Sequence, residues 1–162
     1  MLSRRTFLLS SACAVVLGAS GRYGAASGSE RFPISLSKAE WKRRLTAEQY
    51  AVLREEATEP AWSSPLNAET RPGLYHCAGC DQPIYSSEAK FDSGTGWPSF
   101  HSSLPGAVGT RSDRKLIFIL RTEVHCGRCG GHLGHIFDDG PPPTGQRHCL
   151  NGLALWFAPT QA

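Results

Sequence analysis

Two short stretches, Cys77-Ala78-Gly79-Cys80 and Cys126-Gly127-Arg128-Cys129, decide how this chain folds. Residues 81–125 separate them, and each stretch places two cysteines three positions apart. That spacing lets two thiolates point at one metal ion, and two such pairs complete the tetrahedral four-thiolate set typical of structural zinc. We therefore predict that Cys77, Cys80, Cys126 and Cys129 hold one Zn²⁺, which joins two loops that are distant in the sequence.

Two other interpretations of these cysteines remain open. In an exported protein the four thiols could oxidise to disulfides. A redox-active Cys-x-x-Cys would instead stand where a strand enters a helix of a βαβ unit, and the sequence shows no such unit. Two Cys-x-x-Cys pairs in a strand-rich chain favour a zinc site over disulfides or a redox site.

The composition is that of one globular domain. The chain has 162 residues, of which 40% are hydrophobic and 19% charged, and its 17 glycines and 11 prolines favour turns and short strands. Three of its 17 basic residues, Arg4, Arg5 and Arg22, precede the first acidic residue, Glu30. The rest of the chain has 14 basic and 14 acidic residues, so we expect no nucleic-acid partner.

Residues 1–26 are expected to be an export signal. Ser3-Arg4-Arg5-Thr6-Phe7-Leu8-Leu9 is similar to a twin-arginine signal, and the apolar run 6–18 is short for a membrane span. Cys13 lies in this segment and has no predicted role. We expect a periplasmic or otherwise exported protein that meets the membrane only during export, with an uncleaved anchor as the alternative.

Residues 27–62 are expected to form a helical arm. Ser37 can cap a short turn through Trp41, and Thr46-Ala47-Glu48-Gln49 is a capping box. The second helix is predicted to run to about Ala57, with Tyr50, Leu53 and Ala57 on one face, and Pro60 would stop it.

Residues 63–162 are expected to form the β-rich body, beginning with a polar loop over 63–73. The pattern changes there to a period of two residues. It predicts strands over Leu74–His76, Lys115–Arg121 and Leu150–Phe157.

Cys149 is a fifth cysteine outside the two pairs, within Arg147-His148-Cys149-Leu150-Asn151. A lone cysteine is commonly an inert buried residue, but reactivity is favoured by a polar, cationic setting. Side chains alternate along a strand, so Asn151 shares a face with Cys149 and His148 points the other way. His132 and His135 could be zinc ligands, buried structural residues or proton donors to a reaction centre.

The motifs together resemble one family, the zinc-binding peptide-methionine (R)-S-oxide reductases. They are, in the order of that family, Cys77-x-x-Cys80, Lys90 to Phe100 (Lys-Phe-Asp-Ser-Gly-Thr-Gly-Trp-Pro-Ser-Phe), Cys126-x-x-Cys129-Gly130, His132 to Pro141 (His-Leu-Gly-His-Ile-Phe-Asp-Asp-Gly-Pro) and Arg147 to Asn151. The resemblance covers residues 37–157.

The resemblance implies a mainly β fold of two small antiparallel sheets, arranged like a tent, with short N-terminal helices and zinc away from the active site. It implies that Cys149 is the nucleophile, that Trp97 holds the substrate's S-methyl group, and that His132, His135 and Asn151 surround the sulfoxide oxygen. The reaction it implies is protein repair under oxidative stress. Methionine is restored, and Cys149 becomes a sulfenic acid that an external thiol recycles.

Three positions depart from the family's common pattern. Asp81 replaces a glycine after the first cysteine pair, His148 replaces an aromatic residue, and Thr95 stands where some members carry a resolving cysteine. Without that cysteine we expect a thioredoxin-like or other thiol reductant as partner. The alternatives are an exported zinc-ribbon binding module without catalysis, and a thiol–disulfide oxidoreductase.

Overall fold

The computed structural model describes residues 31–116 and 119–160, so the predicted export signal lies outside the described residues. Residues 31–162 form one compact unit. The strands are β1 (Gly73–Cys77), β2 (Pro83–Ser86), β3 (Lys90–Phe91), β4 (Ser99–Phe100), β5 (Val108–Leu116), β6 (Ile119–Cys126), β7 (His132–Phe137), β8 (Arg147–Leu150) and β9 (Leu155–Pro159). Short 3-10 turns are η1 (Pro65–Asn67), η2 (Ser87–Ala89) and η3 (Gly152–Ala154).

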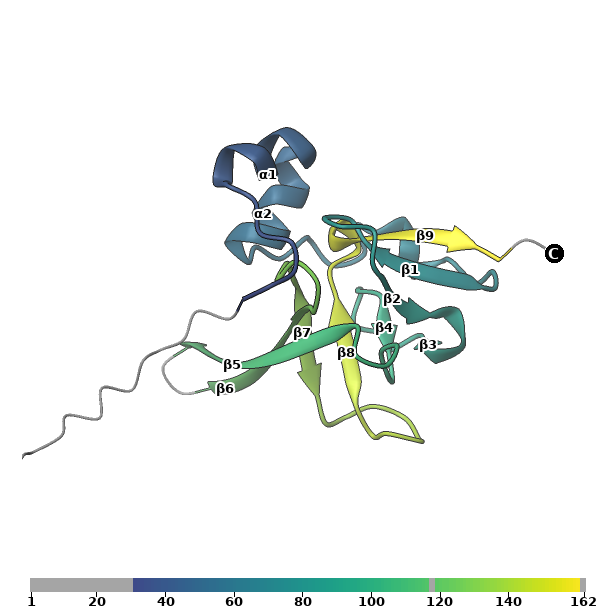
Figure 1. Cartoon of the computed structure of the whole chain (residues 1–162). Coiled ribbons are helices and arrows are strands. Elements are labelled where there is room, and N and C mark those ends of the chain that lie inside the picture. Colours follow the sequence, from purple (N-terminus) through teal and green to yellow (C-terminus); the bar gives the residue numbers. More distant parts are fainter. Residues whose placement is uncertain (1–30, 117–118, 161–162) are drawn as a thin grey trace, which may run out of the picture. The chain divides into compact units, whose positions relative to one another are not determined.

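These strands form two antiparallel sheets (Figure 1). The smaller sheet has the order β2-β1-β9, and the larger has the order β3-β4-β8-β7-β6-β5. The predicted mainly β fold of two antiparallel sheets is confirmed.

Two short helices precede the sheets, α1 (Lys38–Arg44) and α2 (Ala47–Glu55). Both predicted N-termini are confirmed: Ser37 and Thr46 each accept a hydrogen bond from the backbone three residues on, in complete capping boxes. The second helix ends earlier than predicted, because Glu56 adopts a left-handed conformation (φ 56°) well before Pro60. Among the described residues, no helix is long and apolar enough to cross a membrane.

The prediction of a single strand over Lys115–Arg121 is wrong. Its residues belong to two strands, because Leu116 at the end of β5 pairs with Ile119 at the start of β6. The continuous apolar run hides this hairpin from a sequence reading, since it contains no glycine, proline or asparagine to indicate a turn.

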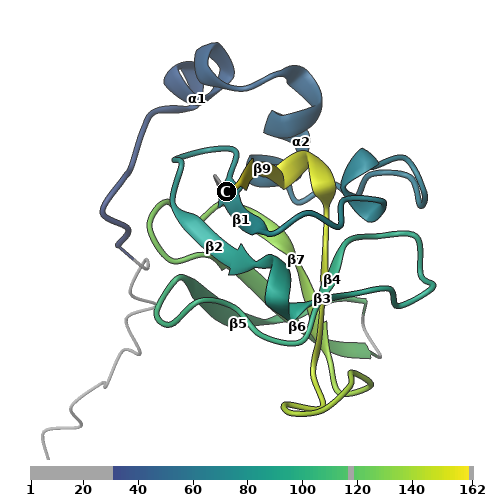
Figure 2. The same cartoon turned by 90° about the vertical axis from the view of Figure 1, so that its right-hand side faces the viewer.

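The predicted strand Leu150–Phe157 is also interrupted. The turn η3 separates β8 in the larger sheet from β9 in the smaller one, so the chain changes sheets there (Figure 2). The carboxylate of Glu59 accepts hydrogen bonds from the backbone N–H groups of Gly152 (2.5 Å) and Leu153 (3.0 Å). A Cβ at Gly152 would overlap the Ser64 hydroxyl, so only glycine fits there.

The core lies between the two sheets. Tyr75 and Tyr85 from the smaller sheet contact Phe100 from the larger one, with ring centroids 4.9 and 4.6 Å apart. All three side chains are fully buried. These aromatic contacts contribute to the apolar core that holds the sheets together.

Candidate active site and metal centre

The four paired cysteines converge at the ends of two loops. Cys77 ends β1, Cys126 ends β6, and Cys80 and Cys129 follow in the turns. All four are buried, and their sulfurs lie within 4.8 Å of one another. The Sγ–Sγ distance is 3.7 Å between Cys77 and Cys129 and 3.5 Å between Cys80 and Cys126.

These distances fit a metal better than disulfides. A tetrahedral zinc with Zn–S bonds of about 2.3 Å separates its sulfurs by about 3.8 Å. A disulfide requires a separation of about 2.05 Å, and the five cysteines of the described chain are all free. The cluster therefore has the donor set and the spacing of a closed metal site.

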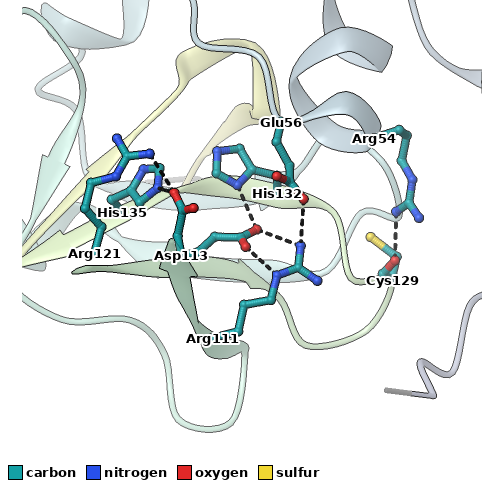
Figure 3. Close-up of polar contacts among 9 residues, drawn as sticks. Arg54, Glu56, Arg111, Asp113, Arg121, Cys129, His132 and His135 are labelled. Carbon is teal, nitrogen blue, oxygen red and sulfur yellow. Dashed lines mark hydrogen bonds and ion pairs between the residues drawn. The ribbon is translucent and has the colours of Figure 1, made fainter. Parts of the chain in front are cut away.

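The N-terminal helices cover this cluster. A Cβ at Gly79 would lie 3.5 Å from Cys77 Sγ and 3.6 Å from the Trp41 ring, and the Arg54 guanidinium lies 4.8 Å from that ring. Arg54 also donates a 3.0 Å hydrogen bond to the carbonyl oxygen of Cys129 (Figure 3). Trp41 on α1 and Arg54 on α2 thus lie against the loops that contain the cysteines.

Asp81 takes part in the turn that follows the first cysteine pair. Its φ of 61° is left-handed, and its backbone N–H donates to the Cys77 carbonyl at 2.9 Å. Its carboxylate accepts a 2.9 Å hydrogen bond from the Trp156 indole. Aspartate tolerates this conformation better than most residues, and here it gains a partner.

Cys149 lies within the larger sheet, on β8. It is directly opposite His135 on β7 and Ser99 on β4, and directly opposed residues share a face of the sheet. The half-buried Cys149 opens into a cavity of about 180 Å³. The cavity is lined by Thr58, Trp97, Arg121, His135, Phe137, Cys149, Leu150 and Asn151.

Four of the five residues predicted for catalysis and substrate binding therefore line one cavity: Trp97, His135, Cys149 and Asn151. His132 does not line it. Its ring is buried behind that of His135, with centroids 5.4 Å apart in an edge-to-face arrangement. A larger cavity of about 710 Å³ lies beside β9 and contains none of the five, so we assign the chemistry to the smaller one.

Burial and polar contacts have opposite effects on the pKa of the Cys149 thiol. Burial raises the pKa of the Cys149 thiol, and this is offset in part by Thr95, whose hydroxyl lies 3.9 Å from the sulfur, and by the charge of Arg147. Arg147 itself is held by two 2.8 Å bonds to the carboxylate of Asp139. The effect of burial is the larger, so the net shift of the Cys149 pKa is upward.

His135 is oriented by a buried carboxylate. Its Nε2–H donates a 2.8 Å hydrogen bond to Asp113 Oδ2, and Arg121 Nη2 donates to the same oxygen at 2.6 Å (Figure 3). Burial lowers the pKa of His135, against the opposing effect of Asp113. In a neutral ring that donates from Nε2, Nδ1 is the proton acceptor.

His132 belongs to a second carboxylate cluster. Its Nδ1–H donates a 2.8 Å hydrogen bond to Glu123, which also binds the Arg111 guanidinium, and Arg111 reaches Glu56 as well (Figure 3). Burial acts to raise the pKa of Glu123, but the hydrogen bonds from His132 and Arg111 overcome it and hold the value at about 2.

Asn151 and Trp97 both form hydrogen bonds to the backbone of Glu59. Its Oδ1 accepts from the Glu59 N–H at 2.9 Å, and its Nδ2 donates to the Leu133 carbonyl at 3.1 Å. The Trp97 indole donates to the Glu59 carbonyl at 3.0 Å. Asn151 therefore fixes the position of Trp97 through Glu59, in addition to lining the cavity.

His148 points away from the cavity, as the alternation of strand side chains predicts. It is buried, and its Nδ1 accepts a 2.9 Å hydrogen bond from the Tyr85 hydroxyl. Burial lowers the pKa of His148 to about 4. This histidine is a neutral core residue in the place of the usual aromatic.

Four lining residues were not predicted as site residues from the sequence: Thr58, Arg121, Phe137 and Leu150. Phe137 stands two residues after His135 on β7 and so shares its face, a signal the alternation rule could have supplied. Arg121 and its partner Asp113 come from β6 and β5, and only the strand register (Asp113 opposite Arg121) brings them to the site.

Comparison with known protein families agrees with this geometry. The SelR domain model matches residues 45–159. Similar proteins include the chloroplastic peptide methionine sulfoxide reductase B1 of rice (46% identity over 83% of this chain and 63% of the relative) and that of Arabidopsis thaliana (51% over 75% and 60%). The peptide methionine sulfoxide reductase MsrB of Agrobacterium fabrum is 49% identical over 78% of this chain and 93% of its own.

The chain thus spans about three fifths of the length of the two chloroplast proteins and nearly all of the bacterial one. The matched region contains both cysteine pairs and every residue that lines the Cys149 cavity. The chain belongs to the SelR-domain family of B-type peptide methionine sulfoxide reductases.

Proposed function

We propose that this chain reduces the R epimer of methionine sulfoxide in peptides and proteins to methionine, with Cys149 as the nucleophile. The observation that carries the proposal is the position of Cys149, whose half-buried sulfur lies directly across the sheet from His135 in a cavity walled by Trp97. An apolar aromatic wall suits a methyl group and a soft sulfur, and the polar side suits the oxygen.

The reaction begins with transfer of the thiol proton to His135 Nδ1, which makes Cys149 a thiolate. The thiolate attacks the sulfoxide sulfur and forms a sulfur–sulfur bond, while the oxygen receives the proton from the imidazolium. The hydroxyl group then passes from the substrate sulfur to the Cys149 sulfur, so that the sulfur–oxygen bond of the substrate and the new sulfur–sulfur bond both break. The oxygen atom and the proton end on Cys149 as a sulfenic acid, and methionine leaves reduced by two electrons. Asp113 and Arg121 hold His135 throughout, and Asn151 holds the Trp97 wall through Glu59.

The stereochemistry follows from the two sides of the cavity. When the methyl group lies against Trp97 and the oxygen faces His135, the rest of the methionine side chain can leave the sulfur in only one direction. The cavity therefore selects one configuration at sulfur. The test is incubation with each epimer of a blocked methionine sulfoxide and dithiothreitol. Turnover confined to the R epimer supports the proposal, and equal turnover of both contradicts it.

The cysteine cluster would hold one Zn²⁺ on Cys77, Cys80, Cys126 and Cys129. The burial of all four sulfurs and their mutual distances support this assignment. Bound zinc would supply structural stability by joining the β1–β2 and β6–β7 loops. Metal analysis that finds about one zinc per chain supports it, and two disulfides by mass spectrometry would contradict it.

Recycling would need a thiol from outside the chain. Cys149 lies beside Thr95, where a resolving cysteine could have formed an internal disulfide. A thioredoxin-like or other thiol reductant would convert the sulfenic acid to a mixed disulfide with loss of water, and a second thiol would release Cys149 as a thiol.

Export by the twin-arginine pathway is supported by the Ser3–Leu9 pattern at the start of the chain. Residues 1–26 would be the signal, 27–62 the helical arm and 63–162 the zinc-binding body. Cell fractionation of the native chain and an Arg4→Lys/Arg5→Lys variant tests this: the native chain is expected in the periplasm and the variant in the cytoplasm. A native chain that stays in the cytoplasm would contradict the proposal.

A further inference from the structure

A second cavity, of about 300 Å³, adjoins the candidate active site. It is lined mainly by apolar and aromatic groups, among them Trp62, Phe91 and Pro98. Trp97 lines both this cavity and the one that contains Cys149. The two cavities are therefore neighbours with one indole in common.

Trp62 is the most exposed large hydrophobic side chain in the described part of the chain, at 67%. Its side chain makes no ring contact or hydrogen bond among the described residues, but its backbone is fixed. Its N–H donates to the Gly96 carbonyl at 2.7 Å, and Asn67 Nδ2 donates to the same oxygen at 3.0 Å. The structure thus holds an uncovered indole beside the loop that carries Trp97.

The absence of a side chain at Gly96 permits the close approach of the Trp62 backbone. Its φ is 91°, and a Cβ there would lie 3.0 Å from the Trp62 backbone nitrogen and 2.9 Å from Ala61 Cβ. Figure 2 shows the loop between β3 and β4 extending to one side of the unit. The hydrogen bonds to Gly96 join that loop to the segment that carries Trp62.

The charges around the second cavity cancel. It contains one cation, Lys90, and one anion, Asp92, and the Lys90 ammonium already donates a 3.0 Å hydrogen bond to the Asn67 carbonyl. A cavity with an aromatic lining and no net charge favours an apolar or aromatic side chain over a charged one.

We propose that this cavity is a subsite for the substrate polypeptide, which receives a large apolar or aromatic side chain next to the oxidised methionine. The inference rests on the proposed function and names its substrate class. Neighbouring residues of a polypeptide have Cα atoms about 3.8 Å apart, and successive side chains of an extended chain that runs along the shared Trp97 indole point to the two sides of that indole. A methionine sulfoxide in the Cys149 cavity therefore places its neighbour within reach of the cavity beyond Trp97.

The test compares kcat/KM for three R-sulfoxide substrates: a blocked single residue, a peptide with glycine on both sides of the sulfoxide, and peptides with phenylalanine on either side. The native chain is expected to favour a phenylalanine peptide over the glycine peptide by about tenfold. Trp62→Ala should erase that preference and leave the blocked residue unchanged. Trp62→Phe should retain most of it.

Trp156→Ala is the matched control. Trp156 is also exposed, at 40%, but it stacks on His76 and lines the cavity beside β9. This variant should keep the phenylalanine preference. A preference unaffected by Trp62→Ala, or lost equally in Trp156→Ala, would overturn the subsite while turnover of the blocked residue upholds the proposed function. Absence of any turnover of the blocked residue by the native chain would overturn both.

Discussion

The five cysteines of the described chain occupy two contrasting regions. Four are buried together at the loop ends, within 4.8 Å of one another and covered by the helical arm. The fifth, Cys149, is half-buried in the middle of a strand and opens into a cavity with His135 and Trp97. The contrast lies in the neighbours: three other thiols surround each cysteine of the cluster, whereas a histidine and an indole share the cavity with Cys149.

The largest expected effect comes from removing one ligand of the cluster. Cys80→Ser should prevent zinc binding and leave the two loops unjoined, so we expect a largely unfolded chain, since structural zinc contributes on the order of 10 kcal/mol. Zinc content and circular dichroism measure this. A Cys80→Ser chain that folds and reduces substrate normally would contradict the separation of the two regions.

Cys149→Ser should have the reverse effect. We expect the fold and about one zinc per chain to be retained, while turnover falls at least about 10³-fold because the nucleophile is gone. The same zinc assay and a thermal unfolding curve provide the control. Loss of zinc in this variant would show that the regions are coupled.

A substitution at Glu123 tests how much its hydrogen bonds to His132 and Arg111 stabilise the fold. Its pKa is about 2 in the fold against an ordinary value of 4.5, so its stabilising effect is present above pH 4.5 and is lost as pH falls toward 2. We expect Glu123→Gln to lower the free energy of unfolding by about 3 kcal/mol at pH 7.

The difference between native and variant chains should shrink below pH 4.5, as measured by urea unfolding at each pH. Comparing the two at one pH cancels the effect of acid on the zinc thiolates. Glu69→Gln, which breaks an ion pair with the exposed Arg71, serves as control and should cost less. A difference that grows toward acid pH would contradict this assignment.

The smallest expected effect is that of pH on the native reaction. Burial lowers the pKa of His135 below 6.5 and raises that of Cys149 above 9. Between these values the pair shares one proton, which is the state the reaction needs. We therefore expect kcat/KM to be flat from about pH 6.5 to 9. A steep rise within that window would show that Cys149 must first lose its proton to solvent.

Local signals in the sequence were sufficient for several elements. The N-caps at Ser37 and Thr46, the cysteine pairs and the opposite directions of Cys149 and His148 depend on short spacings along the chain, and the structure has each of them. The two-residue period predicted the β-rich body, and the resemblance of the motifs implied its two antiparallel sheets.

The features that the sequence could not predict depend on long-range pairing. The hairpin within Lys115–Arg121 and the break at η3 are set by strand register and by the distant Glu59 carboxylate. The carboxylates that orient the histidines, Asp113 and Glu123, lie on strands whose neighbours are known only once the sheet is formed.

The most direct test of the central claim is a single turnover without reductant. The reduced, zinc-loaded chain is mixed with excess R-sulfoxide and dimedone, and methionine, zinc and cysteine adducts are counted. We predict one methionine per chain, one dimedone adduct on Cys149 and full retention of zinc. Release of zinc together with a disulfide from Cys149 to Cys77, Cys80, Cys126 or Cys129 would contradict the account, because the cluster would then take part in the reaction.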